Sequence, residues 1–519
     1  MFILQSVFTY FGGISVSKKV IMIVTIALLL SNAMNGLDST IISTALPAII
    51  SDLHGLQLMG WIVAVFLLGG AVTTPLWSKL GERIGNKSAY QISTLIFVLG
   101  ALLEGLAPNI IFLIAARTVM GIGSGGMTAI PYIIYAEIYK DPVKRGKVFG
   151  YVTASFSTAA IIGPLVGGFI VDNFGWHWVF YINVPIGLAS IAIIQWLYRA
   201  PAVKPATDKV DYLGAVLLSG GLVSLLVGIE MIGKLPAAII GLIILLAISL
   251  LVALTMVERR ASDPIIPLRL FKNRYLLAAF VMFFLIYGFF VGFNVYVPMW
   301  AQGLLGTTAV IGGVTQIPGS VTNFLGAQWS GNMERRWSTR TVVMIGFGGM
   351  LIACGLLALA GRQTNYGFLL LASAFQGCGI GICFTVLQVS VQQQARHQDV
   401  PIATSFSLLV RMLGQTFMAS IYSIVLNHAL TTGVAKSGGQ ITMNMMNELS
   451  DATSASKLPA HLLPAMRTIL HTGLHHIMGV ALVLLVIGLA VNIWGFCAPK
   501  SKPAHHWWSA LGVRHDLNQ

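Results

Sequence analysis

The sequence predicts an all-α polytopic membrane protein, with two bundles of six transmembrane helices and two further helices inserted between them. Hydrophobic residues make up 56% of its 519 residues and charged residues only 9%, well below the roughly 25% charge of soluble domains. The apolar residues form fourteen continuous stretches, each near the ~20 residues that cross a bilayer as a helix. The stretches lack the alternation of an outer-membrane barrel, so we expect helices rather than strands.

The fourteen predicted helices follow one another along the chain. They cover residues 20–47, 59–77, 89–107, 110–136, 147–171, 178–198, 212–232, 236–257, 276–301, 307–330, 341–361, 366–391, 403–427 and 475–497. Breaks in composition predict an N-terminal six-helix bundle at 1–199, an inserted helix pair with linkers at 200–275, a C-terminal six-helix bundle at 276–497 that includes a long outer loop at 428–474, and a tail at 498–519. Two such bundles typically rock about a central site.

Lysine and arginine predict the orientation, because cytoplasmic loops carry an excess of both. With both termini in the cytoplasm, the outer loops hold only Lys234, Arg362, Lys436, Lys457 and Arg467, while Arg117 and Arg411 lie within spans. The net charge of +14 therefore reflects topology, and no nucleic-acid partner is expected. We expect a multi-pass membrane protein without a cleaved signal peptide. The four cysteines have no C-x-x-C spacing, so neither a disulfide framework nor a zinc site is predicted.

The first predicted helix contains one charged residue, Asp38. An acid in hydrocarbon costs at least ~2.5 kcal/mol on insertion scales, so such residues usually face a partner or a cavity and have a function. Arg117 in the fourth helix lies at a similar depth, since both residues are ~12–14 Å below the outer ends of their helices. Equal depth allows the two charges to couple without proving contact. Asp38 is predicted as a proton site and as a candidate contact for a cationic substrate, with a purely structural ion pair as the alternative.

Candidate substrate contacts come from both bundles. Glu104 lies ~6 Å from the outer end of the third helix, where it could either snorkel to the interface or meet a cationic substrate. The second bundle has no carboxylate within its spans. Its polar and aromatic candidates are Asn294, Tyr296, Trp300, Gln316, Asn323 and Gln376, with Tyr287, Gln328 and Gln388 beside them. Apolar pockets with a few orienting polar groups suit bulky amphiphiles.

Two further motifs indicate conformational change. The loop Ser78–Lys87 contains Glu82, Arg83 and Gly85, which could latch helix ends through a charge-assisted hydrogen bond; an ordinary basic loop is the alternative. The fifth helix combines small residues with a helix-bending proline, at Gly150, Gly163, Pro164, Gly167 and Gly168. These residues could serve a moving helix or packing alone.

Two other patterns do not lead to a site. The G-x-G-x-x-G match at 121–126 is not a nucleotide site, because no strand precedes it and it lies within a span. His471, His475 and His476 could hold a metal, but an interfacial histidine cluster is the preferred interpretation. No metal site is therefore predicted.

These motifs together resemble those of the major facilitator superfamily, specifically its fourteen-helix drug/proton antiporters of the EmrB/QacA type. The resemblance covers residues 30 to 430. It rests on Leu37–Pro47, on the 78–87 loop, on Arg117 with Gly121, on the glycines and proline of the fifth helix and on Trp176–Gly187. The loop departs from the family pattern at Ser78, Glu82 and Asn86.

The resemblance implies a proton-coupled exporter of lipophilic, cationic compounds in a bacterial inner membrane. It would work by alternating access, with Asp38 and Arg117 coupling the proton. No cofactor is expected, since the proton gradient supplies the energy. The expected partners are small lipophilic substrates, membrane lipid and, in a bacterium with two membranes, a periplasmic adaptor protein. An exporter of lipids or other amphiphilic metabolites is the alternative. A membrane enzyme is disfavoured, because the sequence contains no catalytic cluster.

Overall fold

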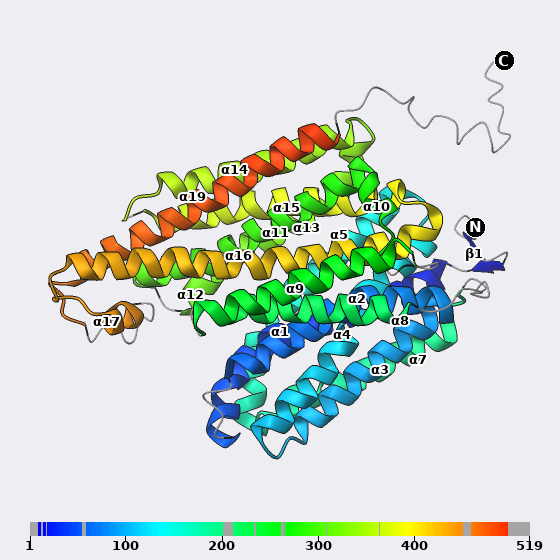
Figure 1. Ribbon diagram of the computed structural model, residues 1–519, viewed down its shortest axis with the longest axis horizontal. Helices are drawn as coiled ribbons and strands as arrows, with labels where there is room; N and C mark the ends of the chain where they lie inside the picture. The colour runs from blue at the N-terminus through cyan, green and yellow to red at the C-terminus, as the bar shows by residue number, and fades with distance from the viewer. Residues whose placement is uncertain are drawn as a thin grey trace, which may run out of the picture.

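The computed structural model describes residues 9–11, 14–16, 18–53, 59–200, 211–232, 235–260, 264, 266–307, 309–362, 364–449 and 458–496. Long helices lie side by side along the long axis of the molecule (Figure 1). Near the N-terminus a short antiparallel hairpin, β1 (Thr9–Phe11) and β2 (Ile14–Val16), precedes them. The hairpin was not predicted, but the prediction of an all-α membrane protein is confirmed by the architecture of the rest of the chain.

The first bundle consists of helices from the N-terminal part of the chain. They are α1 (Lys18–Leu53), α2 (Met59–Ile84), α3 (Asn86–Gly105), α4 (Ile110–Ile138), α5 (Pro142–Phe174), α6 (His177–Tyr181) and α7 (Asn183–Leu197). Helix α4 packs along both α2 and α3, and α5 packs along α1. The sixth predicted span is divided into α6 and α7. Pro185 lies in the first turn of α7, where the N–H that proline lacks is not needed for a helical hydrogen bond.

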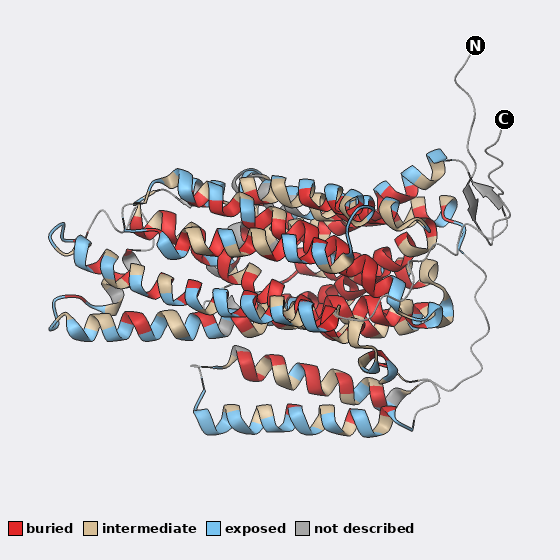
Figure 2. Ribbon diagram, turned by 90° about the horizontal axis from the view of Figure 1, so that it is seen from above, coloured by how far each residue is buried: buried red, intermediate tan, exposed pale blue. Residues whose placement is uncertain are grey.

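Two helices follow that pack mainly on each other, α8 (Tyr212–Glu230) and α9 (Ala237–Glu258). Helix α9 is strongly apolar, yet few of its residues are buried by the rest of the protein. Figure 2 shows this mostly exposed helix at the lower edge of the molecule. An apolar helix left so exposed by its own chain is suited to lipid as its surroundings.

The second bundle contains the remaining helices. They are α10 (Arg269–Lys272), α11 (Arg274–Met299) with the π-helical turn η2 (Trp300–Leu304), α12 (Ala309–Val314), α13 (Ile317–Glu334), α14 (Thr339–Leu359), α15 (Tyr366–Gln394), η3 (His397–Asp399), α16 (Val400–Lys436), α17 (Met443–Glu448) and α19 (Leu463–Gly495). Across both bundles and the inserted pair, each of the fourteen predicted spans falls on one helix or on two consecutive helices. Within the described part of the chain, ten helices are long and apolar enough to cross a membrane.

The long outer loop predicted at 428–474 is shorter than expected. Helix α16 continues to Lys436 and α19 already begins at Leu463, so helical structure occupies both ends of that segment. The apolar pattern missed these ends because a helix can continue with polar residues once its backbone hydrogen bonds are made. The two helices also pack there, since a Cβ on Gly433 would lie 2.5 Å from the side chain of Ile469.

The two bundles contact each other in the half of the molecule where α1 begins, at the right of Figure 1. There Gln328 of α13 donates a hydrogen bond to the Lys147 carbonyl of α5 (3.0 Å), and Gln392 of α15 donates one to the Tyr132 carbonyl of α4 (3.3 Å). Gly331 packs on Val143 at the same end. Toward the left of Figure 1 the N-terminal helices diverge from α16. The bundles are therefore joined at one end.

Candidate functional site

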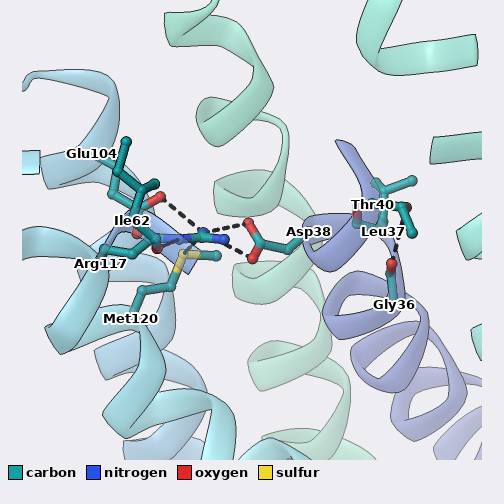
Figure 3. A network of polar contacts seen from close by, with 8 residues as sticks. All are labelled: Gly36, Leu37, Asp38, Thr40, Ile62, Glu104, Arg117 and Met120. Atoms are coloured by element: carbon teal, nitrogen blue, oxygen red, sulfur yellow. Dashed lines mark hydrogen bonds and ion pairs between the residues drawn. The ribbon is translucent and has the colours of Figure 1, made fainter. Parts of the chain in front are cut away.

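The Asp38 side chain of α1 is completely buried and faces Arg117 of α4 (Figure 3). Arg117 Nη1 lies 3.0 Å from Oδ1 and 2.8 Å from Oδ2 of Asp38. Helix α4 starts at a capped position, because the Asn109 side chain accepts a hydrogen bond from the Phe112 N–H (2.9 Å). The two charges that the sequence placed at similar depth therefore form a direct ion pair.

Arg117 is enclosed by four helices. Its Nε donates to the Ile62 carbonyl of α2 (3.1 Å), and its Cζ lies 4.5 Å from the centre of the Phe66 ring. Met120 Sδ lies 3.7 Å from Nη1. Only 1% of Arg117 is exposed, so its charge must be balanced by protein groups.

Glu104 of α3 is the third charged member of this cluster. Its Oε2 lies 3.4 Å from Arg117 Nη1, and the residue is 0% exposed. Its Oε1 is buried with no hydrogen-bond partner in the described part of the chain. Glu104 therefore does not snorkel to the interface. The reason lies beside it, where the Tyr181 hydroxyl donates to the Gly105 carbonyl (2.7 Å) and covers the end of α3.

The cluster of Asp38, Glu104 and Arg117, here called the acid–arginine cluster, combines two carboxyl groups with one guanidinium. With both acids ionised it carries one net negative charge inside the protein, whereas with one proton added it is neutral. Burying a net charge is costly unless it is paired. The geometry is therefore suited to binding one proton whenever the cluster is sealed from water.

The two acids are not held equally. Both Asp38 oxygens lie within 3.0 Å of Arg117 Nη1, whereas Glu104 makes one longer contact of 3.4 Å. An ionised carboxylate is stabilised most by short, charge-assisted hydrogen bonds. The contacts therefore favour Asp38 as the ionised partner of Arg117 and Glu104 as the acid that holds the proton.

The candidate substrate residues of the second bundle do not form one site. Tyr296 packs on Tyr422 of α16 with ring centres 6.0 Å apart, and the buried Trp300 lies against His471 and His475 of α19. Other candidates belong to the packing of α13 on α15, where Gly319 lies beside Gln376 and Gly381 beside Asn323. Gln316 is partly exposed and Asn294 is exposed. Their substrate contacts remain predictions.

The loop after α2 is hydrogen-bonded to α4 through Asn86 and Glu137, a pair that the sequence did not predict. Gly85 has φ 87°, a value that L side chains rarely adopt, and separates α2 from α3. Asn86 donates to Glu137 Oε1 (2.7 Å), and the Tyr198 hydroxyl donates to Oε2 of the same acid. Within the loop Lys79 and Glu82 form an ion pair of 3.1 Å. Glu137, near the end of α4, was missed because nothing in its spacing pointed to Asn86.

The small residues of α5 allow close approach of two different helices. A Cβ on Gly150 would lie 2.6 Å from Gln328 of the second bundle, and a Cβ on Gly163 would lie 2.1 Å from Thr40 Oγ1 of α1. Helix α5 continues through Pro164 and Gly168, whose side-chain surroundings lie outside the described residues, and Gly167 is buried. Close packing of α5 is thus observed, while its movement remains a prediction.

The histidines of α19 bind backbone carbonyl groups at the end of α14. A ring nitrogen of His471 lies 3.1 Å from the Ala360 oxygen, and one of His475 lies 3.1 Å from the Ala358 oxygen. Such groups are favourable at a helix C-terminus, where carbonyls lack intrahelical partners. Among the described residues, no group of three or more His, Cys, Asp or Glu side chains could hold a metal ion.

Comparison with known proteins gives a consistent picture. A family model described as Major Facilitator Superfamily matches residues 28–419. Multidrug resistance protein 3 of Bacillus subtilis is 29% identical over 484 residues, which cover 91% of this chain and 94% of that protein. Multidrug transporter protein MdtP of the same species is 28% identical over 513 residues, covering 92% and 93%.

Similarity extends to a fungal protein and to a solved structure. The rubrofusarin-specific efflux pump aurT of Gibberella zeae is 28% identical over 462 residues, covering 85% of this chain and 82% of that protein. The structure of the proton:xylose symporter XylE superimposes with a TM-score of 0.59 at 15% identity, covering 92% and 96%. At that identity the structural match shows the fold alone.

Proposed function

The chain belongs to the Major Facilitator Superfamily, and on this premise we propose that it is a proton-coupled exporter of lipophilic compounds. It is a multi-pass membrane transporter, and its relatives include proteins named as multidrug transporters and as an efflux pump. The observation that carries proton coupling is the acid–arginine cluster, two buried carboxyl groups on one buried guanidinium. The proton gradient is the energy source, and no cofactor is needed for the exchange.

In the proposed cycle, the cluster takes up a proton while it is open to the outside and cargo leaves. The neutral cluster can then be sealed from water, because it no longer carries a net charge into a low-dielectric interior. When the bundles reopen inward, water stabilises the ionised acid and the proton leaves. Arg117 and Asp38 remain ion-paired throughout, and Glu104 is the acid that exchanges the proton.

Helices α1 and α5 connect the cluster to the place where the bundles meet. Asp38 lies two residues from Thr40, which packs on Gly163 of α5. The same helix contacts α13 at Gly150. A shift of α1 that accompanies protonation would therefore move α5 and loosen or tighten the contact with the second bundle.

The joined end of the bundles is proposed to face the cytoplasm. Basic residues gather at the helix links of this end, an arrangement typical of cytoplasmic loops. They include Lys79, Arg83, Lys87, Lys140, Lys144, Lys147, Arg335, Arg336 and Arg340. The structure then corresponds to an outward-facing state. The bacterial relatives support a bacterial cell membrane, and a periplasmic adaptor protein remains a proposal for a bacterium with two membranes.

The experiment that tests the function is transport into inverted membrane vesicles. We expect lipophilic dyes to accumulate only when the vesicle interior is acidic, and accumulation to stop when an ionophore collapses the pH gradient. The dyes should include cationic, neutral and anionic members, because positive charge of the cargo is a prediction from sequence alone. Dye uptake unaffected by the gradient would contradict proton coupling.

The substitution Glu104→Gln should distinguish the role of Glu104 from that of Asp38. The amide keeps the shape but cannot titrate, so gradient-driven uptake should fall by at least about a hundredfold, the lower end of what a positioned acid or base contributes in proton-transfer catalysis. Asp52→Asn is the matched control, since this residue lies at the exposed end of α1 and its amide oxygen could still accept from Trp176 Nε1. Wild-type uptake by Glu104→Gln would leave Asp38 as the only proton carrier.

A further inference from the structure

Arg411 of α16 is a second arginine within the spans, but its surroundings differ from those of Arg117. Its Cζ lies 4.1 Å from the centre of the Tyr287 ring and 4.6 Å from that of Phe384. The ion pairs of the described residues include none to Arg411. Aromatic faces attract a cation, but they leave its net charge unbalanced.

Arg411 has a buried hydrogen-bond donor without a partner among the described residues. Its Nε is buried with no hydrogen-bond partner in the part of the chain that the structure describes. Guanidinium has five N–H donors and no acceptor, and the described residues supply no acceptor to the buried Nε.

A second unpartnered donor lies one helical turn away. Gln388 of α15 is 0% exposed; its Oε1 accepts from the Ser407 hydroxyl (3.0 Å), while its Nε2 has no partner among the described residues. Gln388 follows Phe384 by four residues on α15, and Ser407 precedes Arg411 by four on α16. Residues four apart lie on one helix face, so both unpartnered donors belong to the same α15–α16 surface.

This surface meets the first bundle. The Tyr132 ring of α4 lies 6.2 Å from the Phe384 ring, centre to centre, and its carbonyl accepts from Gln392. Arg411 therefore lies at the seam between the two bundles, where transporters of this architecture hold their cargo. Asp38 and Glu104 of the first bundle face Arg117, so neither is directed at a cationic cargo in this conformation.

We propose that Arg411, with Tyr132, Tyr287 and Gln388, binds the acidic group of a lipophilic cargo, such as a carboxylate or an ionised phenol. A guanidinium binds such groups through paired, charge-assisted hydrogen bonds. The Phe384 and Tyr287 rings are buried in this conformation, and they would supply apolar contacts to the rest of the molecule when the two bundles separate. The proposal rests on the proposed export function and gives it a substrate class, lipophilic acids in place of cations.

The test is a binding experiment on the full-length protein in detergent, without a proton gradient. The probes are pyrenebutyric acid, its methyl ester and a pyrenyl alkylammonium ion, which share one ring system and differ in charge. Wild-type protein should bind the acid at least about tenfold more tightly than the ester, as expected for hydrogen bonds to a charged group. Equal affinities, or preference for the ammonium ion, would overturn the proposal.

Substitutions then locate the effect. Arg411→Gln should weaken binding of the acid about 10–100-fold while changing the ester less than about twofold, and Arg411→Lys should keep part of the difference. Tyr132→Phe keeps the ring and removes the hydroxyl, so it should weaken only the acid. Arg362→Gln is the control, an exposed arginine that donates to Thr468 (2.6 Å).

Other results would overturn the inference without affecting the export function. Equal weakening of acid and ester in Arg411→Gln would make Arg411 a packing residue. If Arg411→Gln does not fold, Tyr132→Phe decides, because unchanged binding of the acid by that variant contradicts the site. Gradient-driven uptake of the ester in vesicles tests the proposed function separately, since it needs proton coupling but no acidic group.

Discussion

Asp38→Asn protein is expected to fold and to bind cargo, but to lose proton-driven export almost completely. The substitution removes the acid that pairs most closely with Arg117, at 2.8 and 3.0 Å. Removing one partner of a buried ion pair usually destabilises a protein by ~3–5 kcal/mol. Here Glu104, 3.4 Å from the same nitrogen, can replace the lost charge and limit that effect.

The same replacement explains why transport should fail. With one acid left for one guanidinium, the cluster is neutral when Glu104 is ionised, so sealing it no longer favours a proton. Uptake of dye into inverted vesicles should lose its dependence on the pH gradient and fall at least about a hundredfold, a typical minimum for losing a positioned titrating group. Binding of the same dye in detergent should be retained.

Two observations would contradict this role of Asp38. One is undiminished gradient-driven uptake by Asp38→Asn. The other is a comparable loss in Asp52→Asn, the same substitution at the exposed end of the same helix, because that result would trace the effect to α1 in general. Thermal unfolding of both variants identifies any loss that comes from instability.

Gly163→Leu should be the most disruptive substitution in α5. Even a single Cβ at this position would lie 2.1 Å from Thr40 Oγ1 and 3.2 Å from Thr40 Cβ, so a larger side chain must push α1 away from α5. Overpacking of this kind typically costs about 1–3 kcal/mol. Because Thr40 lies two residues from Asp38, we expect the Gly163→Leu protein to fold but to lose export.

A graded series makes this prediction sharp. Gly163→Ala should impair export less than Gly163→Leu, and Thr40→Ala should restore export to Gly163→Ala, because it removes the oxygen that the new Cβ would meet. Transport and melting temperature are the measurements. Gly241→Leu is the control, since a Cβ on this glycine of α9 would meet nothing within 4 Å.

Failure of the rescue would locate the effect of Gly163 elsewhere. If Thr40→Ala leaves Gly163→Ala as impaired as before, the contact between α1 and α5 does not link the cluster to the bundles. Wild-type export by Gly163→Leu would likewise show that the close contact between α5 and α1 at this position is not required for transport.

The sequence by itself determined where the apolar helices lie, their order and the depth of their charges. Each of these properties depends on the composition of a continuous stretch, and membrane insertion responds to that composition directly. The depths of Asp38 and Arg117 could be compared for the same reason, because the rise along a helix is fixed. The sequence did not predict polar extensions of helices, such as the end of α16, because their composition does not differ from that of a loop.

Only the tertiary structure decided which side chains meet. Whether Glu104 points to lipid, to cargo or to Arg117 depends on how α3 is rotated against α4 and on the Tyr181 hydroxyl that covers its end. The pairing of Asn86 with Glu137 likewise joins helices whose rotation no hydropathy pattern records. The unbalanced charge of Arg411 appears only once α11 and α15 place aromatic rings, and no carboxylate, against it. Depth follows from the chain, whereas rotation and partners follow from packing.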